Sequence, residues 1–534
     1  MEQIIKIFGP IYPYSLILLI VLVAYRYTLK RKIKKTIFID LFIYLAIIIY
    51  FISFFSNYKM QFFMILWLIR DFVFFVIISK LWQLYSNYKT SVIIGFFLIV
   101  LAIGFLYYKN GAISFTKAAP VGFDFDKNAE LLFEIKNKQQ LPQVKELLKR
   151  YNPLISIAFP QLTDTLITDL DYCYSIDVKD TSILNSLKDT LEKSGLVSWV
   201  ENNETVYLSP VEKAMQDSVI STGVFSSKSL NDEYLSKLWG FKYMDIDNLI
   251  TALKKRKPVK KARIFILDTG IDSKHEDLSD NYISLSDKYD TDTDQHGTHC
   301  AGIACAVSNN KKGIASFNFT GDFTSITSIT VLPGGSGTQE SIIDGIILAA
   351  DNGADVISMS LGGLSSDLRQ RAYESAIKYA NDKGAIVVVA AGNENTNAKN
   401  VVPASCKGVI AVSAVDENLQ KANFSNYVSD LQYKVSAPGV NIYSTIPLNQ
   451  YKSMNGTSMA TPYVAGLIGI MKSIEPDLTT EDVYRSLISS GIDTKNNEQT
   501  GKFIQPLKSI LDLKTTSTKT RFKVFLNDLL TLKE

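Results

Sequence analysis

The chain has 534 residues, 20% of them charged, and a net charge of +3. This length is typical of three or four domains of about 150 residues each, and so small a net charge excludes nucleic acid as an expected partner. The four cysteines have neither metal-ligand spacing nor the density of a disulfide scaffold. We therefore expect free thiols at Cys173, Cys300, Cys305 and Cys406.

Four strongly apolar runs lie within residues 1–110, and each has close to the about 17–25 residues that cross a bilayer. They cover residues 11–27, 37–55, 62–78 and 91–108. The first run has no basic leader and no small-residue cleavage site, which favours a retained membrane helix over a secretion signal. The sequence thus predicts a four-helix transmembrane region, with the lipid bilayer as a partner.

Six cations directly after the first run indicate the orientation: Arg26, Lys30, Arg31, Lys32, Lys34 and Lys35. The positive-inside rule places this loop in the cytoplasm, and four crossings return the rest of the chain to the extracytoplasmic side. We interpret the pair Arg70-Asp71 in the third run as a helix-packing pair, with an intramembrane functional site as the alternative. If the third run does not cross, the following domains lie in the cytoplasm instead.

Residues 128–209 alternate expected strands and helices in the order β-α-β-β-α-β, which is the ferredoxin-like α+β arrangement. The strands are expected at 131–135, 154–159, 171–178 and 196–200, with a closing strand at 205–208, and the helices at 141–150 and 183–193. This domain has no cluster of titratable residues, so its residues alone assign no function. Residues 210–230 are polar and predict an exposed linker.

From Ala262 onward, apolar strands alternate with helices, which predicts an α/β fold with a parallel sheet and helices on both faces. Strands are expected at 263–268, 327–332, 354–360, 385–392 and 408–415, and helices at 341–350 and 368–381. In such sheets, functional residues gather outside the carboxyl ends of the strands. We therefore searched these ends for chemically competent side chains.

Four residues stand at such positions. Asp268 ends a strand, Asn393 follows another, Ser458 opens an apolar helix, and His296, one of three histidines, precedes a helix. Each alone is explained as well by a structural role, as a turn residue, a helix cap or a buried imidazole. Together they supply the nucleophile, base, orienting carboxylate and oxyanion donor of acyl transfer.

Five motifs resemble those of the subtilisin family, in the family's order Asp, His, Ser: "ILDTGID", "HGTHCAGI", "VISMSLGG", "AAGNEN" and "NGTSMATPYVAG". The resemblance covers residues 231–512 and implies a subtilisin-like serine endopeptidase. It implies that Asp268, His296 and Ser458 are catalytic, with Asn393 in the oxyanion hole. The implied substrate-binding residues are Ser336 and Gly337 in "GGSGT", and Ser360, Leu361, Gly362 and Gly363 in "SLGG".

The resemblance has further implications for the rest of the chain. Residues 128–209 resemble the family's propeptide, an intramolecular inhibitor and folding aid, with self-cleavage expected between 207 and 234, and residues 513–534 form a tail. Val401 is expected at the floor of the pocket for the residue before the cut. The loop 307–316 is shorter than the family's best-known calcium loop, so that site is expected to be missing. No cofactor is predicted, and other calcium sites stay open.

Three function classes follow from these patterns. The preferred one is a membrane-tethered serine endopeptidase that is made as a self-processed zymogen and acts on protein or peptide substrates. A non-catalytic binding module on the same fold is disfavoured because every triad residue is present. The third class, a membrane sensor or transporter, is supported only by the pair Arg70-Asp71, since the four runs lack evident repeats or broken helices.

Overall fold

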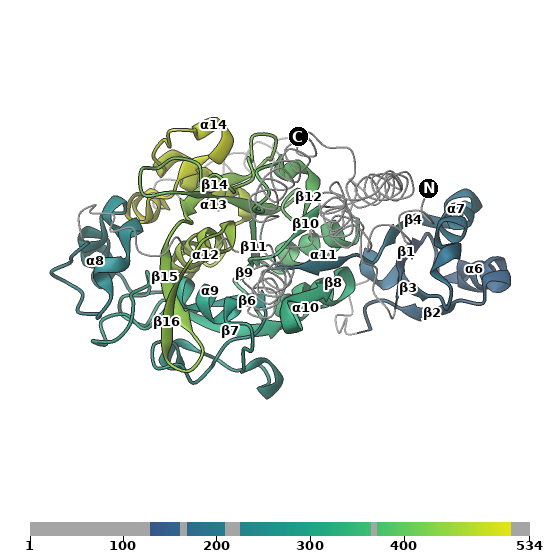
Figure 1. Cartoon of the computed structure of the whole chain (residues 1–534), viewed down its shortest axis with the longest axis horizontal. Coiled ribbons are helices and arrows are strands. Elements are labelled where there is room, and N and C mark those ends of the chain that lie inside the picture. The colour runs from purple at the N-terminus through teal and green to yellow at the C-terminus, as the bar shows by residue number, and fades with distance from the viewer. Residues whose placement is uncertain (1–128, 161–167, 209–224, 365–370, 514–534) are drawn as a thin grey trace, which may run out of the picture. The chain divides into compact units, whose positions relative to one another are not determined.

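The computed structural model describes residues 129–160, 168–208, 225–364 and 371–513 (Figure 1). The four predicted membrane runs, most of the predicted linker and the tail from residue 514 lie outside these residues. Within the described ranges, no helix combines the length and apolar character that a bilayer crossing requires.

The first described part is a ferredoxin-like domain of β-α-β-β-α-β order. Its elements are β1 (Leu131–Ile135), α6 (Leu141–Leu148), β2 (Leu154–Ile157), β3 (Cys173–Asp177), α7 (Leu184–Ser194) and β4 (Val197–Asn202). The antiparallel sheet has the order β2-β3-β1-β4. Helix α7 buries Leu184, Leu187 and Leu191, whose spacing places them on one helical face. The expected order of elements is therefore present.

The expected closing strand of this domain pairs elsewhere, which corrects the prediction for residues 205–208. Strand β5 (Thr205–Tyr207) runs antiparallel to β8 (Ser336–Thr338), with Val206 opposite Gly337. Val206 is buried in the same apolar cluster as Leu332 and Ile342 of the following domain. Burial of Val206 there, and pairing of the exposed edge of β8, explain why the strand leaves its own domain.

The second part is built on a seven-stranded parallel sheet of order β17-β14-β13-β11-β9-β6-β7. Its strands are β6 (Ala262–Asp268), β7 (Thr324–Thr330), β9 (Val356–Met359), β11 (Ile386–Ala390), β13 (Val409–Val415), β14 (Lys434–Pro438) and β17 (Lys502–Phe503). The predicted parallel sheet is confirmed, and β7 begins three residues before the predicted strand. Strands β14 and β17 were not predicted.

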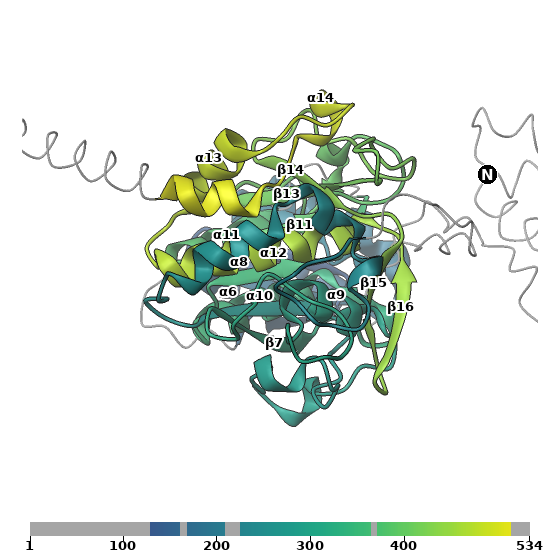
Figure 2. The ribbon, with the colours of Figure 1, turned by 90° about the vertical axis from the view of Figure 1, so that its left-hand side faces the viewer.

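Helices cover both faces of this sheet, as expected (Figures 1 and 2). On one side lie α9 (His296–Cys305) and α12 (Thr457–Ile474), and on the other α10 (Gln339–Asp351) and α11 (Arg371–Asp382). Strand β6 serves both cores, because Ile264 and Ile266 face the first pair of helices while Phe265 and Leu267 face the second. Every apolar residue of this strand is therefore buried.

A hairpin of β15 (Ile442–Ile446) and β16 (Gln450–Met454) packs on α9. The hydroxyls of Ser444 and Thr445 donate to backbone carbonyls of α9 at 2.8 and 2.7 Å. A Cβ at Gly302 would lie 2.3 Å from the Thr445 hydroxyl, so only glycine permits this approach. The His299 ring donates from Nε2 to the Lys452 carbonyl oxygen at 2.9 Å.

The buried ring of His299 makes stability depend on pH. Burial lowers its pKa from 6.5 to about 3. Between these values the unfolded chain binds a proton that the folded chain does not, so the free energy of unfolding falls as pH falls from 6.5. We expect this histidine alone to lower the free energy of unfolding by about 2 kcal/mol at pH 5, relative to pH values above 6.5. In His299→Gln, an amide donor replaces the ring, and thermal unfolding between pH 7 and 5 should vary less. Parallel pH profiles would contradict this role.

Candidate active site

The fold brings three of the predicted residues together at the carboxyl end of the sheet. Asp268 is the last residue of β6, His296 the first of α9, and Ser458 the second of α12. All three side chains are buried. This edge is where parallel α/β sheets place functional groups.

The imidazole of His296 is held by Asp268. Its Nδ1 lies 2.8 Å from Asp268 Oδ1, so with a proton on Nδ1 the ring donates to the carboxylate. Burial opposes ionisation of the ring, whereas Asp268 and, to a lesser extent, Cys300 favour the charged form, and together they raise the pKa of His296 well above its usual value. The second nitrogen, Nε2, is buried and has no hydrogen-bond partner among the described residues. The ring is thus oriented with one basic nitrogen left for chemistry.

A small polar network fastens the start of α9 to the end of β6. The Thr269 hydroxyl accepts from Gly297 N at 3.0 Å and donates to Asp292 Oδ1 at 2.9 Å. The other oxygen of Asp292 accepts from the backbone N and the hydroxyl of Thr298. Sequence reasoning missed Asp292, although a carboxylate four residues before His296 is a recognisable signal for the start of a helix. This network fixes the spacing between Asp268 and His296.

Ser458 lies after Gly456, whose φ of 151° favours glycine. Its hydroxyl donates to the Ser360 carbonyl oxygen at 3.2 Å, and the Ser360 hydroxyl donates to the Ser458 carbonyl oxygen at 2.8 Å. The Cys300 thiol also donates to this carbonyl, at 3.5 Å, and its Sγ lies 4.0 Å from His296 Nδ1. Ser458 is therefore held at the helix start by contacts with Ser360, which directly follows β9, and with Cys300 of α9.

Cys300 was predicted only to be a free thiol, and all four cysteines are free and buried. Burial raises the pKa of the Cys300 thiol, which keeps it protonated as a donor. Its sulfur, Asp268 and His296 offer metal-ligand atoms within 4.8 Å of one another. Because the carboxylate and imidazole already bind each other, we assign no metal to this cluster.

Asn393 has the geometry of a prepared hydrogen-bond donor. Its Oδ1 accepts from the backbone N and the hydroxyl of Thr457, both at 2.9 Å. The same hydroxyl accepts from Gly392 N at 3.1 Å. These bonds fix the amide, whose Nδ2 is buried and has no partner in the described part of the chain. Asn393 Nδ2 could therefore donate to an oxyanion without reorientation of the amide.

The predicted substrate-binding residues fall on two segments. Ser336 and Gly337 belong to β8, which β5 occupies, and Leu208 N donates to the Gly335 carbonyl at 3.0 Å. Ser360, Leu361, Gly362 and Gly363 directly follow β9 and enter β10 (Gly363–Leu364). Strand β10 pairs with β12 (Val401–Val402). A Cβ at Gly362 would lie 3.4 Å from Val401 Cγ1, so Val401 packs behind this segment.

A second polar cluster involves the loop 307–316. Asp232 Oδ1 accepts from the backbone of Asn309 and Asn310, and Asp277 accepts from the Asn310 side chain and Ile314 N. Asp232 Oδ2 is buried without a partner among the described residues. Burial raises the pKa of Asp232 to about 6 and of Asp277 to about 7. Three of the four carboxylate oxygens already accept N–H donors, so we assign no cation to this cluster.

Comparisons with known proteins identify the family of this chain. The model of the Subtilase family matches residues 260–505. Thermitase of Thermoactinomyces vulgaris is 47% identical over 220 residues, 40% of this chain and 75% of that protein. Subtilisin DY of Bacillus licheniformis is 40% identical over 250 residues, 45% of this chain and 87% of that protein. The crystal structure of fervidolysin from Fervidobacterium pennivorans covers 72% of this chain and 61% of its own, with a TM-score of 0.59 and 22% identity, which shows a shared fold.

Proposed function

The chain belongs to the subtilase family and is a serine endopeptidase; from this premise we propose that Ser458 is its nucleophile and His296 its general base. The observation that carries the assignment is the bond of 2.8 Å between His296 Nδ1 and Asp268 Oδ1. It places the ring proton on Nδ1 and leaves Nε2 as the basic atom. Asp268 is then the carboxylate that orients the base and stabilises its charged form.

In the proposed reaction, the Ser458 hydroxyl turns from the Ser360 carbonyl toward His296 Nε2. The proton passes from Oγ to Nε2 as Oγ attacks the peptide carbonyl carbon. Asn393 Nδ2 and the backbone N of Ser458, which has no partner within its helix, donate to the oxyanion. Nε2 then gives its proton to the leaving amine. In the second half of the reaction, Nε2 takes a proton from a water molecule as the water oxygen attacks the ester carbonyl carbon, and then returns the proton to Ser458 Oγ.

Removing the nucleophile tests this assignment. Ser458→Ala leaves the ring pair intact but has no oxygen to form an ester, so a fluorophosphonate probe should not label the purified chain. Ser453→Ala, on the hairpin β15–β16, is the matched control and should label like the natural chain. Labelling that persists in Ser458→Ala would identify a different nucleophile.

We further propose that residues 128–209 are a propeptide that inhibits the enzyme until it is cut. Strand β5 supports this, because it occupies the edge of β8 that contains the predicted substrate-binding residues Ser336 and Gly337. Extended peptides bind such edges by strand addition, so β5 and a substrate would compete for the same backbone groups.

Polar contacts around the ends of α10 and α11 strengthen this association. Asn203 donates from Nδ2 to the Glu340 carboxylate at 3.2 Å, and accepts from Glu340 N at 3.0 Å. The carboxylate of Glu201 accepts from Gln339 Nε2 at 3.2 Å and from the backbone N of Arg371. Carboxylates and amide oxygens satisfy the free N–H groups at helix starts. The ferredoxin-like domain therefore caps two helices of its neighbour.

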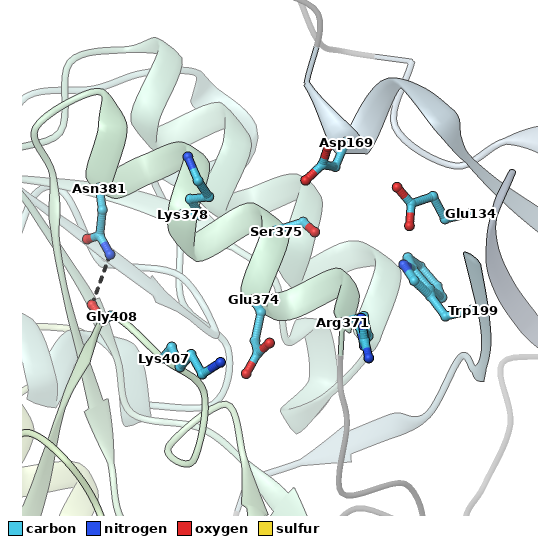
Figure 3. A pocket seen from close by; sticks show the side chains of 10 residues that line it. All are labelled: Glu134, Asp169, Trp199, Arg371, Glu374, Ser375, Lys378, Asn381, Lys407 and Gly408. Carbon is cyan, nitrogen blue, oxygen red and sulfur yellow. Dashed lines mark hydrogen bonds between the residues drawn. The ribbon is translucent and has the colours of Figure 1, made fainter. Parts of the chain in front are cut away.

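A cavity of about 390 Å³ lies beside these contacts (Figure 3). From the ferredoxin-like domain, Glu134, Asp169 and Trp199 face α11, which contributes Arg371 and Lys378 among others. Burial, and to a lesser extent Asp169, raises the pKa of Glu134. The interface is thus mixed in charge and incompletely packed, which suits a partner that is later released.

Self-processing is tested by the same substitution in a different measurement. If the enzyme cuts its own chain between about residues 207 and 234, Ser458→Ala should remain full length in cells while the natural chain yields a shorter fragment. The fragment's N-terminus is read by mass spectrometry. Cleavage of Ser458→Ala in a host that lacks other secreted proteases would refute self-processing.

We propose that residues 1–110 anchor the enzyme in a membrane, with the protease on the extracytoplasmic side. The support is the set of four apolar runs and the six cations after the first run. The four native cysteines are free and buried, so the experiment uses a thiol introduced as Lys127→Cys. An impermeant thiol reagent should label it in intact cells. Labelling only after lysis would place the protease in the cytoplasm.

A further inference from the structure

The loop between α8 (Ile246–Lys254) and β6 has a strongly asymmetric charge. Residues 254–261, called here the basic loop, read "KKRKPVKK" and contain six cations and no acid. The net charge of the whole chain is only +3, so this loop is a local exception and not a reflection of composition. None of the proposed catalytic steps uses it.

The basic loop has a fixed conformation. Arg256 donates from its guanidinium to the Ile510 carbonyl at 3.1 Å, and from its backbone N to the Leu253 carbonyl at 2.9 Å. Val259 N donates to the Ser473 carbonyl at 2.8 Å, and Lys260 Nζ lies 2.5 Å from Asp355 Oδ1. Two of the six cations are therefore used to hold the loop in place.

The other four cations point to solvent. Lys254, Lys255, Lys257 and Lys261 are exposed, and none has an ion pair with another described residue. Between them Val259 is 72% exposed, and Leu511, adjacent to the Ile510 anchor of Arg256, is 51% exposed. Four lysines without an ion pair thus share this anchored loop with an exposed aliphatic side chain, and a second one lies beside the anchor of Arg256.

We propose that the basic loop binds the anionic headgroups of a lipid membrane. Lysine ammonium groups attract anionic lipids, and exposed aliphatic side chains beside them can enter the interfacial layer of a membrane. A soluble polyanion has no such layer, so it would leave the aliphatic side chains in water. This inference rests on the proposed membrane location of the enzyme. The loop lies at the amino end of β6, whereas Asp268 ends that strand roughly 20 Å away. Contact with lipid would thus leave the catalytic edge accessible.

The test uses the full chain with Val259→Cys, labelled with an environment-sensitive fluorophore and reconstituted in vesicles. Since the native cysteines of the described part are buried, the introduced thiol takes the label. We expect a blue shift in vesicles with about 30% phosphatidylglycerol, absent in pure phosphatidylcholine and reversed by about 0.5 M salt. Leu511→Cys is a second reporter in case the first variant folds poorly. Leu448→Cys, 80% exposed on the β15–β16 turn, is the control that should not shift.

A matched variant replaces Lys254, Lys255, Lys257 and Lys261 with glutamine. It should lose the shift at both reporters while its labelling by a fluorophosphonate is unchanged. No shift in anionic vesicles, or an equal shift in neutral ones, would overturn the proposal. On the same samples, flotation with neutral vesicles tests the proposed membrane anchor, and fluorophosphonate labelling tests the proposed nucleophile. Failure of either proposal can therefore be distinguished from failure of the proposal for the basic loop, which only the fluorescence shift tests.

Discussion

The contact between Asp268 and His296 is the constraint on which the site depends. It joins the end of β6 to the start of α9, two elements that meet only because the parallel sheet places its carboxyl ends along one edge. The network of Thr269 and Asp292 holds the same junction a second time. The buried carboxylate would be costly alone, and its partner both neutralises it and sets which ring nitrogen is basic.

The residues that the sequence identified are informative as a combination, since each alone could have a structural role. The site residues Asp268, His296, Ser458 and Asn393 have polar or reactive side chains at the ends of elements. Apolar strands such as β11 and β13 are recognisable from their composition. Their catalytic roles remain proposals. Thr457 was missed because its hydroxyl matters only through the amide that it orients.

Local patterns also misplace elements whose partners are distant. Strand β5 has an ordinary strand sequence, but its partner β8 lies about 130 residues later, so no local signal distinguishes it from a closing strand of its own domain. Strand β14 contains Lys434 and Pro438, and β17 has only two residues, so neither resembles the buried core of a sheet. The membrane runs lie outside the described residues and stay predictions.

The pairing of β5 with β8 has a consequence for how fully the edge of β8 is occupied before and after a cut in the chain. While the chain is continuous, the occupying strand is tethered, and its effective concentration is set by the tether and not by the amount of protein. If the tether is cut as proposed, the same contacts would become bimolecular and would weaken on dilution. A crowded membrane patch and a dilute solution would then hold the same cleaved molecule in different states.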